Sequence, residues 1–332
     1  MSKLLPIVIV IIVVSPVVAR AHHGVAAVGF GNMEGPGVRL ETTSPLTLPK
    51  NNLYLMFKDE RVSFQKFGFA DPKNKDPFDF LTLAVGYGIN QYLSVYLFQP
   101  YSIKTQQSLG TASGFADTSL MLTLGFKYDK EFLLIPEKET LDDLMDWHFS
   151  ISVASTIPLG NSVRKDKTGA YFSADMQNGF GVMSPSIDCA VMKQISNDFT
   201  WLADISYQYF PEHRYSSIAF QFGAEAKLST SVAYRLLVTN KMRLDIIAEA
   251  SVLNLQRDKQ SDKSSSLKDV AASGGTIIYA IAGARLFYDR FSVAVGVKKA
   301  VLSSLNEKNQ QQGTEGLENY RFFVTVGYCF GL

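Results

Sequence analysis

The feature that most constrains the fold is an alternation of apolar and polar residues that recurs in stretches of about ten residues. The last stretch, 319–330, places Tyr320 and Phe322 on one face and Arg321 and Thr325 on the other. A period of two is typical of a β-strand, because successive side chains point to opposite faces. A tilted strand needs ~9–11 residues to cross a bilayer. The pattern therefore predicts membrane-spanning strands with one face toward lipid and one toward water.

Twelve stretches of this kind follow one another along the chain. They cover residues 53–64, 79–88, 92–103, 116–128, 147–157, 182–194, 199–209, 218–236, 242–253, 276–288, 291–301 and 319–330. An even number of strands with both termini on one side is usual in single-chain bacterial barrels. We therefore predict an all-β fold, a transmembrane antiparallel up-and-down β-barrel of about 12 strands.

The connections between these stretches alternate in length, as they do in outer-membrane barrels with short periplasmic turns and long outer loops. The short ones are 89–91, 195–198, 238–241 and 289–290, and the long ones are 65–78, 104–115, 158–181, 254–275 and 302–318. Segment 129–146 is long where a short turn is expected. Either the segment is a periplasmic insertion, or the count of strands is wrong by a hairpin at this point.

A soluble β-sandwich also alternates apolar and polar positions. Sandwich strands usually have ~5–6 residues, which is shorter than the stretches here. In a membrane, an open sheet edge would leave backbone groups unpaired in hydrocarbon, so the sheet has to close. Strand length therefore favours the barrel.

The N-terminus has the pattern of a cleaved export signal. Lys3 precedes an apolar stretch, 4–18, and Ala19-Arg20-Ala21 gives an A-x-A cleavage pattern. We predict a signal peptide at 1–21, a mature chain that begins at His22, and location in the bacterial outer membrane.

Residues 22–52 form a Gly/Pro-containing segment, called here the N-terminal segment, and residues 53–332 form the predicted barrel domain. Two interpretations of the segment stay open. It either folds into the lumen as a plug or remains a tail on the periplasmic side.

Net charge and cysteine content say little about function. The formal net charge is +1, and loss of Lys3 and Arg20 with the signal would leave about −1, so nucleic acid is not an expected partner. Cys189 and Cys329 lie on opposite faces of separate predicted strands, and we expect two free thiols.

Several short motifs resemble those of the outer-membrane transporter family called "MetA-pathway of phenol degradation". They are HHGVA at 22–26, EGPG at 34–37, LET at 40–42, GYG at 86–88 and FADTSL at 115–120. The resemblance implies a barrel channel in the outer membrane that takes up small molecules. The family's name is no argument for phenol chemistry.

The last strand also resembles the signal that the β-barrel assembly machinery reads, an alternating aromatic strand that ends in Phe330. Here Gly331 and Leu332 follow that phenylalanine, which departs from a strictly terminal aromatic residue. The resemblance implies this machinery as a partner, besides outer-membrane lipid.

Charged residues on the polar faces of the strands are the candidate pore lining. They are Asp188, Asp204, Glu225, Lys227, Arg243, Asp245, Glu249, Arg285, Lys298 and Arg321. One interpretation is an electrostatic lining that selects a polar or charged solute. The other is a set of mutually paired ladders that fill a barrel of intermediate width. Both remain open.

Histidines suggest two other sites. His22 and His23, with a free α-amino group at the mature terminus, could chelate a copper-like or zinc-like ion. His148 and His213 are the only bases of a hydrolase type, and no G-x-S-x-G motif accompanies them. We therefore predict no enzyme and no cofactor.

The sequence thus predicts an outer-membrane channel for passive passage or binding of a small solute that it does not identify. The first alternative is a structural or adhesive barrel that acts through its outer loops, such as 158–181 and 254–275, and the second is an outer-membrane hydrolase.

Overall fold

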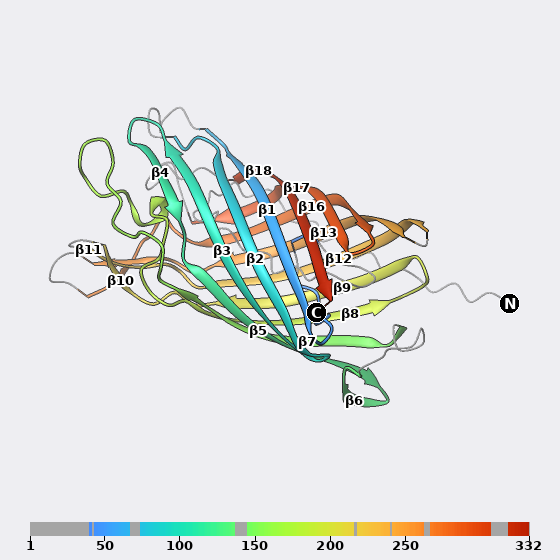
Figure 1. Ribbon diagram of the computed structural model, residues 1–332. Coiled ribbons are helices and arrows are strands. Elements are labelled where there is room, and N and C mark those ends of the chain that lie inside the picture. Colours follow the sequence, from blue (N-terminus) through green and yellow to red (C-terminus); the bar gives the residue numbers. More distant parts are fainter. Residues whose placement is uncertain are drawn as a thin grey trace.

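The structure is a computed structural model. It describes residues 40–41, 43–66, 74–136, 145–215, 218–239, 241–261, 266–306 and 318–331. Most of these residues belong to one large antiparallel sheet that closes on itself, because its strands β3 and β5 pair with each other as well as with their other neighbours (Figure 1). In the described part of the chain, no helix is long and apolar enough to cross a membrane.

Twelve strands form the closed barrel. They are β1 Asn52–Phe64, β2 Phe78–Asn90, β3 Leu93–Gln106, β5 Thr118–Asp129, β7 Trp147–Ile157, β8 Pro185–Gln194, β9 Phe199–Gln208, β12 Glu225–Val238, β13 Met242–Leu255, β16 Gly275–Tyr288, β17 Phe291–Leu305 and β18 Glu318–Gly331. The first and last strands pair from Asn52 opposite Gly331 to Phe64 opposite Glu318. The predicted twelve-stranded barrel is confirmed.

Alternation of side chains decides which face of each strand is inside. In β18, Arg321, Phe323 and Cys329 are buried, whereas Phe322 and Tyr328 are exposed on the outer surface. Apolar side chains on the outside suit lipid, and polar ones inside suit a lumen. Cys189 is exposed and Cys329 is buried, and both are free thiols, as predicted.

The predicted strand 218–236 is wrong in one respect, because it is two strands. Its first part is β11 Ile218–Gln221, and β12 begins only at Glu225. Residues 222–224 separate the two strands, and the backbone N–H of Gly223 donates to Asp258 Oδ1 at 2.7 Å. A Cβ at this position would lie 1.9 Å from the carbonyl oxygen of Gln256, so this close approach requires glycine.

Two predicted outer loops contain further strands. Four short strands, β10 His213–Tyr215, β11, β14 Lys259–Ser261 and β15 Lys268–Asp269, form a separate sheet beyond the barrel. Residues 104–115, predicted as a loop, are mostly a hairpin in which β4 Gly110–Phe115 pairs with the end of β3.

Segment 129–146 is an insertion and does not change the strand count. After β5, the short strand β6 Glu131–Leu134 folds back on residues Phe126 to Asp129 of β5, while β5 still pairs with β7 along its length. β6 lies at the barrel end where the chain's C-terminus lies (Figure 1). The hypothesis of a miscounted hairpin is therefore wrong. Residues 137–144 lie outside the described residues.

Candidate functional site

The predicted lining charges all lie on the inner wall, but they do not form one cluster. Seven of them are less than 9% exposed, namely Asp188, Asp204, Asp245, Glu249, Arg285, Lys298 and Arg321, and Glu225, Lys227 and Arg243 are half-buried. Strand register divides them into three groups along the barrel axis.

The group nearest the short turns pairs internally. Arg243 Nε lies 3.1 Å from Asp245 Oδ2. The Arg243 guanidinium also lies over the ring of Phe287, 3.9 Å from its centroid. Asp245 stands opposite Arg285 in the β13–β16 register. At this level of the lumen, the paired-ladder interpretation describes the charges.

The middle group holds the N-terminal segment. Glu41 Oε2 lies 2.9 Å from Lys298 Nζ, and Glu41 Oε1 lies 4.0 Å from Lys58 Nζ. Burial raises the pKa of the Glu41 carboxyl, but Lys298, Lys58 and Arg321 outweigh burial and hold the pKa well below its usual range. Glu249 completes the contact by accepting the backbone N–H of Leu40 at 2.8 Å.

The same ionic network continues along β1 and β18. Lys58 Nζ lies 3.0 Å from Glu60 Oε1, and Arg321 bridges Glu60 at 3.3 Å and Glu318 at 3.0 Å. All of these side chains are almost fully buried. Lys58 and Glu60 were not among the predicted lining charges. They nevertheless occupy alternate positions of a predicted strand, as the predicted lining charges do.

The described part of the N-terminal segment crosses the lumen from wall to wall. Leu40 packs with residues of β12, β13, β16, β17 and β18, and Leu46 packs with Met192 and Leu202. Leu48 belongs to a cluster from β1, β2, β3, β5 and β18. The segment then runs beside the β2–β3 turn, where the backbone N–H of Leu48 donates to Ser94 Oγ at 2.8 Å. It therefore occupies the half of the lumen toward the short turns.

One wall residue shows how closely the segment fits. A Cβ at Gly88 of β2 would lie 2.0 Å from the carbonyl oxygen of Pro49, which is far inside van der Waals contact. Only glycine lets the segment lie this close to the strand.

From the other side, residues 158–184, called here the outer loop, fold into the barrel mouth. Phe172 and Met176 are buried against Phe64 and Phe78. Lys104 Nζ donates to the carbonyl oxygens of Asp175 at 2.9 Å and Gln177 at 2.7 Å, and Lys75 pairs with Asp175 at 2.8 Å.

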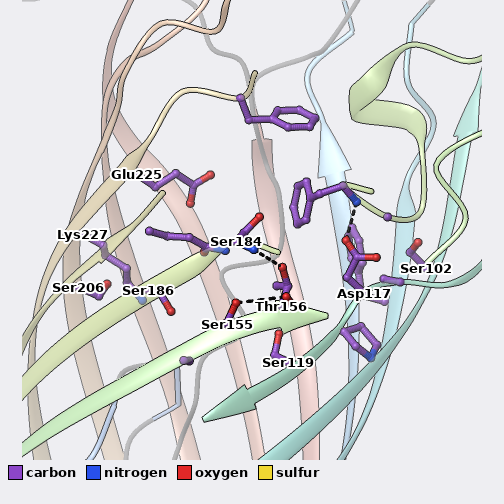
Figure 2. A pocket seen from close by; sticks show the side chains of 18 of the residues that line it. Ser102, Asp117, Ser119, Ser155, Thr156, Ser184, Ser186, Ser206, Glu225 and Lys227 are labelled. Carbon is purple, nitrogen blue, oxygen red and sulfur yellow. Dashed lines mark hydrogen bonds between the residues drawn. The ribbon is translucent and has the colours of Figure 1, made fainter. Parts of the chain in front are cut away.

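Asp117, between β4 and β5, fastens both ends of the outer loop. Its carboxylate accepts the backbone N–H of Gly160 at 2.9 Å and of Phe180 at 2.6 Å (Figure 2). Burial raises the pKa of this carboxyl above its ordinary value, and the hydrogen bonds from Phe180 and Gly160 oppose that rise. The resemblance motif that contains Asp117 thus has a structural role at the mouth.

Between the outer loop and the N-terminal segment lies a cavity of about 160 Å³, called here the chamber. Glu41 and Thr43 line it at one end, and loop residues such as Gln177 and Phe180 line it at the other. Its wall carries Ser102, Ser119, Ser152, Ser155, Thr156, Ser184, Ser186, Asp188, Asp204, Ser206, Glu225 and Lys227, many of which Figure 2 shows around a common space. Four of the predicted lining charges thus meet here, and they are the group nearest the mouth.

The two histidines of the described residues lie in different sheets. His148 is fully buried in β7, with Nδ1 3.2 Å from the Asp146 carbonyl oxygen, and His213 lies in β10 of the separate sheet. The prediction of no enzyme stays a prediction. His22 and His23 lie outside the described residues, so their predicted metal site is untested. The described residues contain no group of three potential metal ligands.

No protein-family model matches the chain, and no curated protein sequence does. Its structure is similar to that of the COG4313 outer membrane channel from Pseudomonas putida F1, with a TM-score of 0.61 and 13% identity over 88% of this chain and 100% of that one. At this identity the likeness shows the fold. The chain has the fold of an outer-membrane β-barrel.

Two other likenesses are too distant to carry an argument. They are the β domain of the Bordetella autotransporter BrkA, with a TM-score of 0.42 and 8% identity over 84% of this chain and 99% of that one, and LpxR from Salmonella typhimurium, with a TM-score of 0.35 and 8% identity over 83% and 99%. The resemblance to the phenol-pathway family stays a prediction, since no family model matches.

Proposed function

We propose that this protein is an outer-membrane channel that binds a small solute in the chamber and passes it by diffusion. The observation that carries the proposal is a cavity inside a closed barrel, between the outer loop and the N-terminal segment. An engineered apolar cavity of about 150 Å³ binds benzene, so the chamber is of a size to hold a small organic molecule. Passage then requires that one of the two boundaries move.

The N-terminal segment is the boundary that we propose moves, as a plug. Its described residues, 40–41 and 43–51, belong to no strand, and they are held in the lumen by contacts with side chains of the wall. The outer loop, in contrast, is fastened by Asp117, Lys75 and Lys104 together.

Planar-bilayer conductance of the refolded chain from His22 tests both proposals. We expect a small current from that chain and a larger one from a variant that lacks residues 22–50. A Glu41→Lys variant should behave like the deletion, because a third cation beside Lys58 and Lys298 would expel the segment. Absence of current from all three proteins would contradict the channel, and equal current from all three would contradict the plug.

Export by residues 1–21 and insertion through β18 complete the proposal. Expression in a Gram-negative host followed by membrane fractionation should place the mature protein in the outer membrane, with His22 as its first residue. Recovery in a soluble fraction would contradict this location. An adhesive barrel would instead use the four-stranded sheet beyond the barrel, and it would need no conductance.

A further inference from the structure

Hydroxyl groups are the commonest polar groups among the residues that line the chamber. Figure 2 shows most of them around one space. A side-chain hydroxyl both donates and accepts hydrogen bonds, so this wall can bind solute groups of either kind. The hydroxyl groups belong to Thr43, Ser102, Ser119, Ser152, Ser155, Thr156, Ser184, Ser186 and Ser206.

Strand register places other polar groups beside these hydroxyls. Ser186 stands opposite Gln208, and Gln208 stands opposite Glu225, in one row across β8, β9 and β12. In the next inward-facing row, Asp188 stands opposite Ser206. Neighbouring strands lie only ~4.8 Å apart, so a solute with several hydroxyl groups can bond to more than one of these side chains at once.

The charged side chains that line the chamber already have interactions. Lys75 pairs with Asp175, and Lys104 donates to two carbonyl oxygens. Asp117 accepts two backbone N–H groups, and Glu41 belongs to the ionic network described above. The others also take part in interactions, namely Asp188, Asp204, Glu225 and Lys227. A charged solute would therefore have to displace existing partners or share them.

A neutral hydroxyl group, in contrast, can be added to a carboxylate that already has a partner. An ionised carboxyl group offers two oxygens with about four acceptor sites. A hydrogen bond to an ionised acceptor is also stronger than one between neutral groups. Asp188 and Glu225 can therefore accept hydroxyl groups of a solute and keep the interactions that they have.

One hydroxyl group of the chamber has no hydrogen-bond partner within the described residues. It is Ser184 Oγ, on a residue that is only 1% exposed. The backbone N–H of Ser184, not its hydroxyl, donates to Thr156 Oγ1 at 2.9 Å (Figure 2). A buried hydroxyl without a partner costs free energy, and a hydroxyl group of a solute would supply that partner.

Aromatic rings form another part of the chamber. Phe78 and Phe80 come from β2, Phe180 comes from the outer loop, and Phe222 precedes β12. The ring centroids of Phe180 and Phe222 lie 5.3 Å apart. The face of an aromatic ring is negative, so it attracts the C–H groups of a sugar ring. The chamber therefore suits a solute with C–H groups on its faces and hydroxyl groups around its rim.

Resting on the proposed channel function, we propose that the chamber selects an uncharged solute rich in hydroxyl groups, a single-ring sugar or polyol. Its hydroxyl groups bond to Ser184, Ser186 and Ser206 and to the carboxylates beside them. Its C–H face lies toward Phe180 and Phe222.

Probes with one ring test the inference: glucose, glucosamine, glucuronate and cyclohexanol, with myo-inositol as a second neutral polyol. Calorimetry on the refolded chain from His22 should show glucose or myo-inositol binding at least about tenfold more tightly than cyclohexanol, which lacks all but one of the hydroxyl groups. Glucosamine and glucuronate should bind more weakly than glucose, because their charges would disturb the existing ion pairs.

A double variant, Ser186→Ala with Ser206→Ala, should bind glucose about tenfold less tightly and should keep its affinity for cyclohexanol. Ser304→Ala, in the exposed end of β17, is the matched control and should change neither affinity.

Ser184→Ala supplies a second variant in case the double variant fails to fold, and it should weaken glucose binding about threefold to tenfold. The inference would be overturned if neither glucose nor myo-inositol bound more tightly than cyclohexanol, if a charged sugar bound more tightly than glucose, or if both variants kept the full affinity for glucose. With conductance present, these results would overturn the inference alone. Absence of both conductance and binding would overturn the proposed channel as well.

Discussion

At the scale of single residues, one carboxylate links the N-terminal segment to the barrel. Glu41 is the segment's only described acid, and it lies between lysines on two different strands, Lys58 of β1 and Lys298 of β17. Removing one partner of a buried ion pair usually costs 3–5 kcal/mol, because the other charge stays buried without compensation. Much of the segment's attachment should therefore depend on this side chain.

Glu41→Gln should release the segment and lower the melting temperature of the refolded protein, with a loss of about 3 kcal/mol in the attachment. Protease cleavage within residues 40–51 reports the release directly. Glu131→Gln, an exposed position in β6, is the control. Unchanged protection in Glu41→Gln would show that Leu40, Leu46 and Leu48 hold the segment without the charge.

Acid should release the segment only at very low pH. The pKa of Glu41 is lowered in the folded state, so its stabilising contribution is complete above the ordinary pKa of 4.5 and is lost as pH falls from there through the lowered value. We expect bilayer conductance at pH 5 to match that at pH 7. A sharp opening between pH 7 and pH 5 would contradict this assignment.

At the scale of elements, the β6 hairpin extends the aromatic surface at the short-turn end. The ring of Phe132 lies 5.8 Å from Phe126, 5.1 Å from Tyr128 and 5.6 Å from Phe149, all from β5 and β7. Phe132 itself is 65% exposed, which places it on the surface that suits the membrane interface. We therefore expect the insertion to anchor β5 and β7 at the membrane interface.

Phe132→Ala should destabilise the refolded protein by about 1 kcal/mol, because ring pairs contribute ~0.5–1.5 kcal/mol each and this ring is exposed. Leu133→Ala, whose neighbour across the hairpin is Lys127, is the matched control and should have a smaller effect. Urea unfolding in lipid vesicles measures both. Equal losses would show that the aromatic contacts contribute nothing specific.

The elements were largely predictable from the sequence, and the site was not. Strand length and a period of two are local properties that lipid imposes on each strand, so all twelve barrel strands could be found one by one. The interruption at Gly223 could not be predicted, because the Gln256 carbonyl that causes it is close in space but distant in sequence. The ion pairs of Arg321 with Glu60 and of Glu41 with Lys298 could not be predicted either, because they form only once the two ends of the sheet meet.

At the scale of the whole molecule, the closed sheet should make the protein resistant to detergent denaturation. Each barrel strand has a partner on both sides, which leaves no edge in the bilayer. The unheated refolded protein should migrate faster in sodium dodecyl sulfate gels than the boiled protein. A variant that lacks residues 319–331 leaves β1 and β17 without their partner and should show only the slow form.

The position of Glu41 also sets an order of assembly. Its two lysines stand on the first and the second-last strand, and Arg321 on the last strand continues the same network. The seam between chain beginning and chain end must therefore come together before the docking place for Glu41 exists. Although the segment precedes every barrel strand in the sequence, we expect it to dock last, after β1 has paired with β18.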